Sequence, residues 1–178
     1  MQAFTLETTV ARPRELVYDY LADVAHHPEF LDHFLKEWHM TREETFGLGA
    51  GGRFRAEVPF QRFPWGDWAI VQLEPPHRIV LHGRTGKFNR VRTLTVFELR
   101  AGPAGGTVVT VTVESRPRFA SDRFLDTLGR RAVRRRWGAA LRRLRRILEE
   151  DRDRGTRATI AGGPRKPATS TRPPVTHV

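Results

Sequence analysis

Two side chains in this sequence stand at positions from which they could act on a bound molecule. His82 falls in a predicted strand, and an imidazole that faces inward there can work as an acid or a base. Arg130 falls on a predicted helix at about 20° from Trp137 around the helix axis, on its apolar side. An arginine there pairs with a ligand carboxylate or enolate, or packs its stem while its head reaches water. Both residues are candidate catalytic groups, and ordinary structural roles are the favoured alternative for each.

Other catalytic signatures are missing from the sequence. The chain has no cysteine, which excludes disulfides, thiolate metal sites and cysteine nucleophiles. It contains neither a GxSxG elbow nor a P-loop. Gly47, Gly49 and Gly52 match GxGxxG, but they precede an alternating strand instead of opening a helix, and so indicate a turn.

A group of histidines near one aspartate raises the question of a metal. His26, His27 and His33 lie close to Asp32, but their spacing is not HExxH. One short helix cannot readily direct all four groups at one ion. We expect neither a metal nor a cofactor.

The elements that would position these residues follow from apolar periodicity. Two-residue alternation predicts strands and helical spacing predicts helices. Strands are expected at 4–10, 37–45, 53–60, 67–74, 78–84, 91–99 and 107–115, and helices at 13–24, from 28 onward and at 121–150. The strand connections are short, which favours antiparallel neighbours. The predicted class is α+β, with about seven antiparallel strands, two short helices after the first strand and a long C-terminal helix.

Threonines interrupt an apolar register on the predicted strand at 91–99. Thr93 and Thr95 share a register with Val91 and Phe97, so they place hydroxyls in an apolar wall. The high strand propensity of threonine is the alternative explanation. Ten residues are candidate ligand contacts: Phe30, Trp68, Ile70, His82, Thr93, Thr95, Val111, Val113, Phe124 and Leu128.

The predicted long helix carries two apolar stripes and most of the charge imbalance. Leu128 and Trp137 are about 180° apart, so either the helix bends near Gly129 or both faces are covered. Residues 1–115 hold 13 basic and 14 acidic side chains, whereas residues 116–178 hold 18 and 6. Such a basic surface attracts nucleic acid or anionic membranes. However, 28 of the 31 basic residues are arginine throughout the chain, which indicates a codon bias.

The ends of the chain give further expectations. The first ten residues do not form a signal peptide, and no apolar run approaches the roughly 20 residues of a membrane span. We therefore expect a soluble, cytoplasmic protein. Residues 151–178 are rich in glycine, proline and charge, so a domain at 1–150 followed by a disordered basic tail is predicted.

Several short stretches occur in the order typical of one superfamily. They are VYDYLADV at 17–24, PEFL at 28–31, LEPPHRIV at 73–80 and GGT at 105–107. In these stretches the chain resembles the START/polyketide cyclase (SRPBCC) superfamily. The resemblance implies a helix-grip fold, in which a curved sheet wraps around the final helix and encloses a cavity for a hydrophobic molecule. It assigns no catalytic residue.

Three functions follow in order of preference. The first is binding or transport of a lipid, quinone or aromatic polyketide-like molecule in that cavity. The second is a polyketide cyclase or dehydrase reaction in the same cavity, with His82 or Arg130 as acid/base or enolate partner. Binding of nucleic acid or of an anionic membrane through the arginine-rich helix is third, and peripheral membrane contact is compatible with all three.

Overall fold

The computed structural model describes residues 2–59, 63–156 and 158–160. One mixed sheet has the strand order β1-β7-β6-β5-β4-β3-β2-β8, and all neighbours are antiparallel except β2 and β8. The predicted sheet of seven antiparallel strands with a long final helix is confirmed, and β8 is a two-residue addition. The strands are β1 (Phe4–Val10), β2 (Leu35–Met40), β3 (Gly51–Ala56), β4 (Trp65–Glu74), β5 (Arg78–Thr85), β6 (Val91–Ala101), β7 (Thr107–Pro117) and β8 (Thr159–Ile160).

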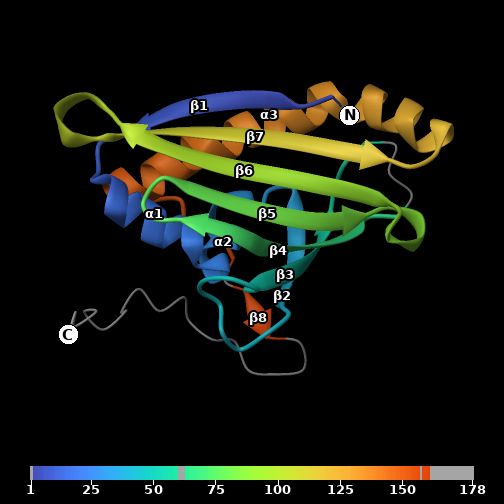
Figure 1. Ribbon diagram of the computed structural model, residues 1–178, viewed down its shortest axis with the longest axis horizontal. Helices are drawn as coiled ribbons and strands as arrows, with labels where there is room; N and C mark the ends of the chain where they lie inside the picture. The colour runs from blue at the N-terminus through green and yellow to red at the C-terminus, as the bar shows by residue number, and fades with distance from the viewer. Residues whose placement is uncertain (1, 60–62, 157, 161–178) are drawn as a thin grey trace.

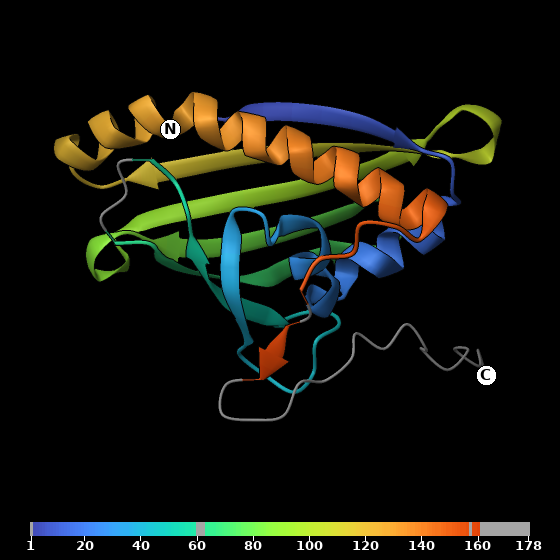
Figure 2. The same cartoon turned by 180° about the vertical axis from the view of Figure 1, so that it is seen from behind.

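The helices all lie to one side of the sheet. They are α1 (Arg14–Ala22), α2 (His27–Leu31) and α3 (Ala120–Glu150), with 3-10 turns η1 (Val24–His26), η2 (Lys87–Asn89) and η3 (Pro103–Gly105). In Figure 1 the sheet is in front and α3 runs behind it, and Figure 2 shows α3 crossing the curved inner face. The short helices pack at the end of the sheet nearest the C-terminus of α3. The sheet thus grips α3 along one face.

Local sequence explains where the first helices begin. Pro13, at φ −57°, precedes α1, and its carbonyl accepts from the amide of Val17 at 3.2 Å. The Asp23 side chain then caps η1 by accepting from the amide of Ala25 at 3.0 Å. Leu21 and Val24 are fully buried, so both turns are fixed by packing as well as by caps.

The core forms between the inner face of the sheet and the apolar stripe of α3 that contains Trp137. On β6, Phe97 and Leu99 are buried on either side of the exposed Glu98, on the face predicted for this strand. From the helix, Trp137, Leu144 and Ile147 are almost completely buried against them. Each such side chain contributes roughly 1.5–3 kcal/mol by burial, so this packing fixes α3 over the sheet.

The apolar stripe of α3 that contains Phe124 and Leu128 is left uncovered. The helix is continuous from Ala120 to Glu150, but Phe124 is 66% exposed and Leu128 is 49% exposed. Of the two alternatives expected from the sequence, a bend near Gly129 or cover on both faces, the second does not hold, because no described element packs on the outer side of this half of the helix. Two exposed large apolar side chains on a basic helix call for another explanation.

Part of the segment predicted as a disordered tail, residues 151–156 and 158–160, is described by the structure. Asp151 ends α3 in the left-handed conformation, with φ 54°, and the chain then folds back toward α2. Arg154 pairs with the buried Glu29, and Asp32 accepts from the amide of Thr156 at 2.6 Å. In this segment of disorder-like composition, residues 154 and 156 thus make specific polar contacts with α2 and the residue after it, and β8 pairs with β2. Residues 157 and 161–178 lie outside the described residues.

Candidate functional site: an apolar cavity under the long helix

A cavity of about 460 Å³ lies between the inner face of the sheet and the N-terminal half of α3. Its volume is in the range of small-molecule sites, roughly 300–1,000 Å³. Most of its wall is apolar. The apolar wall comprises Phe34, Leu35, Phe54, Ala56, Val58, Pro59, Phe63, Trp68, Val91, Val113, Leu125, Val133 and Trp137.

Aromatic rings close the inner end of the cavity. The centroids of Trp68 and Trp137 are 6.4 Å apart, and Phe54 lies edge-on to Trp68 at 4.9 Å. Phe34 packs edge-on against Trp137 at 6.1 Å. Aromatic pairs at these separations stabilise one another and provide flat apolar surfaces to a planar ligand.

Gly83 on β5 leaves room for the two residues that flank it in the sheet, Trp68 on β4 and Thr93 on β6. A Cβ atom at Gly83 would lie 2.3 Å from the carbonyl oxygen of Asp67 and 2.6 Å from Oγ1 of Thr93. Any larger residue would displace the backbone of β4 or the wall of the cavity. Glycine is therefore required here by close packing.

Hydroxyl groups interrupt the apolar wall, and three of them, on Thr93, Thr95 and Ser115, lie on β6 and β7. Thr93 lies directly opposite Ser115 in the β6–β7 pairing, and Thr95 lies opposite Val113. Within the described residues, neither Thr93 nor Thr95 makes a side-chain hydrogen bond, although Thr95 is only 3% exposed. Ser115 Oγ donates to the carboxylate of Asp126 at 2.7 Å and so joins β7 to α3. The two threonine hydroxyls are available to a molecule in the cavity.

Charged residues gather where the cavity opens beside the start of α3. Arg90 forms two short contacts with Asp122, from Nε to Oδ2 and from Nη2 to Oδ1, both at 2.6 Å. The guanidinium of Arg90 also lies 4.7 Å from the ring centroid of Phe119. Such a two-point pair fixes the start of β6 to the first turn of α3. It therefore holds one side of the opening in place.

Four of the ten predicted contact residues line this cavity: Trp68, Thr93, Thr95 and Val113. They come from β4, β6 and β7, and the alternation on these strands identified the correct face. The structure brings them together with α3, as the helix-grip arrangement implies.

Five other candidates lie elsewhere. Phe30, Ile70 and Val111 are almost completely buried in the core and do not border the cavity. Phe124 and Leu128 are exposed on the outer side of α3. Periodicity assigns a residue to a face, but whether that part of the face meets solid core, cavity or solvent depends on how the helix is placed.

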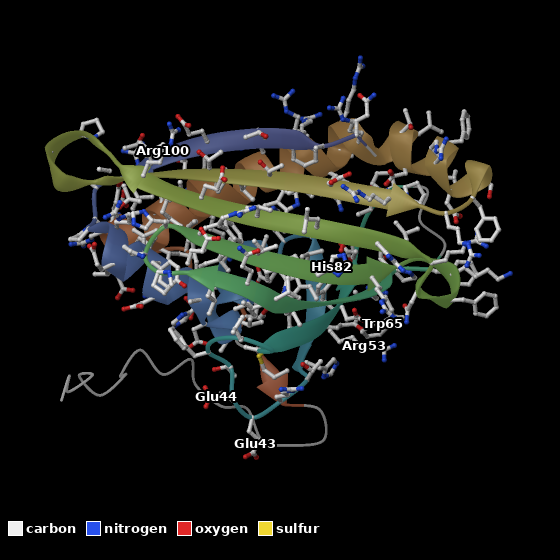
Figure 3. The ribbon with its side chains drawn as sticks, in the orientation of Figure 1. Glu43, Glu44, Arg53, Trp65, His82 and Arg100 are labelled. Atoms are coloured by element: carbon white, nitrogen blue, oxygen red, sulfur yellow. The ribbon has the colours of Figure 1, made fainter. Side chains whose placement is uncertain are left out.

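The prediction that His82 faces inward is wrong. It is exposed on the face of the sheet opposite α3, between the inward-facing Leu81 and Gly83, and Figure 3 labels it on β5 in front of the sheet. Arg130 does not border the cavity either. Its Nη2 donates to the carbonyl of Ala3 at 3.2 Å, a contact that anchors the start of β1. The positions of His82 and Arg130 do not support the catalytic roles predicted for them.

The histidines near α2 make separate structural contacts. His26 stacks on Tyr20 with ring centroids 4.4 Å apart, and His33 Nε2 contacts the carbonyl oxygen of Arg136 at 3.1 Å. His27 is fully buried, and its Nε2 lies 2.8 Å from the carbonyl oxygen of Leu21. Burial lowers the pKa of His27 to about 4, so the ring is neutral and its Nε2 donates this bond. Within the described part of the chain, no three His, Asp or Glu side chains gather as metal ligands would.

Several wall residues were missed by the sequence prediction. Phe54 and Ala56 on β3 alternate with Val58 just beyond it, and Val133 and Trp137 share a helical stripe, so periodicity identified their faces without linking them to the site. The acidic residues Asp122 and Asp126 gave no signal, because carboxylates on a basic amphipathic helix usually indicate only a solvated face.

Comparisons with known proteins were consistent with this architecture. None of the helices that the structure describes is long and apolar enough to span a bilayer. No curated protein matches the chain significantly. Among solved structures, protein CV1439 from Chromobacterium violaceum is 18% identical, with a TM-score of 0.61 over 84% of this chain and 99% of that one.

Two further structures come from a plant and a bacterium. Ginseng major latex-like protein 151 from Panax ginseng is 9% identical, with a TM-score of 0.59 over 82% of this chain and 96% of its own. Protein Ms6760 from Mycobacterium smegmatis is 15% identical, with a TM-score of 0.58 over 82% and 90%. At these identities the likeness establishes the fold, a helix-grip fold of the Bet v 1 type.

The family follows from the sequence over most of its length. The model of the family described as polyketide cyclase / dehydrase and lipid transport matches residues 1–149, which span every element from β1 to nearly the end of α3. The matched region contains the whole cavity wall. The chain belongs to the polyketide cyclase/dehydrase and lipid transport family.

Proposed function

We propose that the protein binds a hydrophobic small molecule, with a flat ring system, in the cavity under α3. The observation that carries this proposal is the composition of the wall: aromatic rings at the closed end and two threonine hydroxyls without partners among the described residues. A cavity of about 460 Å³ suits a molecule of two to four rings. Thr93 and Thr95 would orient an oxygen atom of that molecule.

Carriage of the molecule is favoured over its chemical conversion. Efficient proton transfer requires an acid or base within reach of the reacting atoms. His82 and Arg130, which the sequence suggested for that role, lie outside the cavity. The carboxylates in its wall are already paired: Asp122 with Arg90, Asp126 with Ser115 and Glu114 with Arg116. The observations therefore support binding or transport more directly than a cyclase reaction.

Native mass spectrometry of protein purified from its own host tests the proposal. A co-purified small molecule is expected in the wild-type protein, and organic extraction should release it. The informative variant is Val133→Phe, because Val133 lines the cavity and is only partly buried. Its matched control is Leu128→Phe, on the same helix but exposed and outside the cavity.

The molecule should be lost from Val133→Phe and retained by Leu128→Phe. Retention by both variants would place it outside this cavity and overturn the proposal. Recovery of nucleic acid alone, with a steep dependence on salt, would instead favour the basic surface as the functional site.

A further inference from the structure

The exposed apolar side chains of this protein are concentrated around the mouth of the cavity. Ten large hydrophobic residues are exposed in the described part of the chain, and six of them lie at the mouth or on the adjoining outer side of the first half of α3. We call these six the apolar rim: Phe63, Phe88, Phe119, Phe124, Leu125 and Leu128. Single exposed apolar residues are ordinary, but a cluster of six indicates a contact surface.

Contacts place the rim residues together. Phe63 and Leu125 border the cavity themselves. Phe119 lies under Arg90, which also borders it, and the ammonium of Lys87 is 5.9 Å from the ring of Phe63 and 5.2 Å from that of Phe88. Figure 2 shows the start of α3 and the β5–β6 connection at the same end of the molecule. Leu128 follows Phe124 by one helical turn and continues the surface along α3.

A row of arginines extends the rim along the outside of α3. At 100° per residue, Arg131, Arg135 and Arg142 fall within about 60° of arc together with Phe124 and Leu128. All three arginines are exposed, and none forms an ion pair within the described residues. Residues 116–150 contain twelve arginines and four carboxylates, so this face is strongly positive. The outer side of α3 thus combines an apolar end with a basic row.

We propose that the apolar rim and this basic row form a docking surface for an anionic lipid bilayer. Amphipathic helices that lie on membranes combine Phe or Leu with Lys and Arg in this way. Each basic residue near an anionic leaflet adds about 1 kcal/mol to membrane binding. Phenylalanine and leucine side chains gain nothing from a phosphate backbone in water, so nucleic acid accounts for the arginines but not for the rim.

The shape of the rim favours a bilayer over a protein partner. Phe88 is 87% exposed in the turn between β5 and β6, with φ 55°, so its ring projects from the surface. A projecting ring enters a fluid interface without a matching pocket, whereas a protein partner must provide one. Docking here would also turn the mouth of the cavity toward the membrane.

Vesicle flotation with the full-length chain tests the surface. The vesicles are phosphatidylcholine alone and phosphatidylcholine with about 30% phosphatidylglycerol, each at about 50 and 500 mM salt. Strong binding is expected only to the anionic vesicles at low salt. Phe124→Ser/Leu128→Ser and Arg131→Ser/Arg135→Ser should each reduce that binding by about tenfold or more. The control Leu48→Ser/Val71→Ser replaces exposed apolar residues outside the rim and should bind like the wild type.

Three outcomes would overturn the inference. They are equal binding to neutral and anionic vesicles, absence of binding to either, and an equal loss in the rim and control variants. Recovery of one acidic protein, with vesicle binding absent, would assign the surface to a protein. Val133→Phe separates this inference from the proposed function, because blocking the cavity should leave vesicle binding intact, whereas the rim variants should keep their cavity ligand.

Discussion

Trp68 and Trp137 come from the sheet and from the long helix, and their rings meet at a centroid distance of 6.4 Å at the closed end of the cavity. Their contact has two consequences. It ties α3 to β4 at the depth where the core ends and the cavity begins. It also places two indole rings in the wall, so that a bound molecule should change tryptophan fluorescence.

Trp137 should contribute strongly to stability because it is buried and contacts Phe34, Trp68 and Phe97. We expect Trp137→Ala to lower the free energy of unfolding by about 3–5 kcal/mol, measured by urea denaturation. The control is Trp65→Ala, at an exposed position, which should cost less than about 1.5 kcal/mol. Equal effects of the two substitutions would mean that α3 is not held through this contact.

Thr95 should affect ligand affinity and not stability. In Thr95→Val the side chain keeps its shape and loses a hydroxyl that has no side-chain partner among the described residues. Affinity for 4-hydroxystilbene, followed by tryptophan quenching, should fall by about 3- to 10-fold, and affinity for stilbene should stay the same. Thr112→Val, at an outer position of β7, is the control. An unchanged preference between the two probes would exclude Thr95 as a polar anchor.

His27 should make stability depend on pH in the acidic range. Its pKa is lowered from 6.5 to about 4 by burial, so the unfolded chain takes up a proton at a higher pH than the folded chain does. The stability associated with neutral His27 is complete above about pH 6.5 and is lost as the pH falls toward 4, by about 3 kcal/mol at most.

The comparison variant for this effect is His27→Gln. Denaturant unfolding between pH 4 and 7 should show a flatter pH profile for His27→Gln than for the wild type. His82→Gln, which replaces an exposed histidine, should retain the wild-type slope. Identical slopes in all three proteins would show that His27 is protonated equally in both states.

Arg154 should stabilise the fold from beyond the end of α3. Its guanidinium pairs with Glu29, a buried residue of α2 that also accepts from the Tyr20 hydroxyl at 2.9 Å. Arg154→Ala removes one partner of a buried carboxylate and should lower the melting temperature, at a cost of about 1–3 kcal/mol. Arg152→Ala, two residues away and exposed, should have little effect. Similar small effects would mean that residues after Glu150 are not part of the stable domain.

The sequence by itself determined the elements and their order. Alternation along each strand and helical spacing along α3 reflect which side chains leave water, and this is a local property of the chain. The correct inward face was therefore predicted for Thr93, Thr95 and Val113. The helix-grip fold followed from short motifs in order, and the observed sheet with its long final helix confirms it.

Only the tertiary structure decided which inward residues border open space. Val111 and Val113 share one face of β7, yet Val111 is in the core and Val113 lines the cavity, because the two halves of α3 meet the sheet differently. The exposure of Phe124 depends on the same arrangement, whereas His82 lies outside the site because it alternates with the inward-facing Leu81 and Gly83 on β5. The folding back of Arg154 onto Glu29 also depends on the tertiary structure. The Arg154–Glu29 contact joins residues more than 100 positions apart, and periodicity carries no information about partners at that distance.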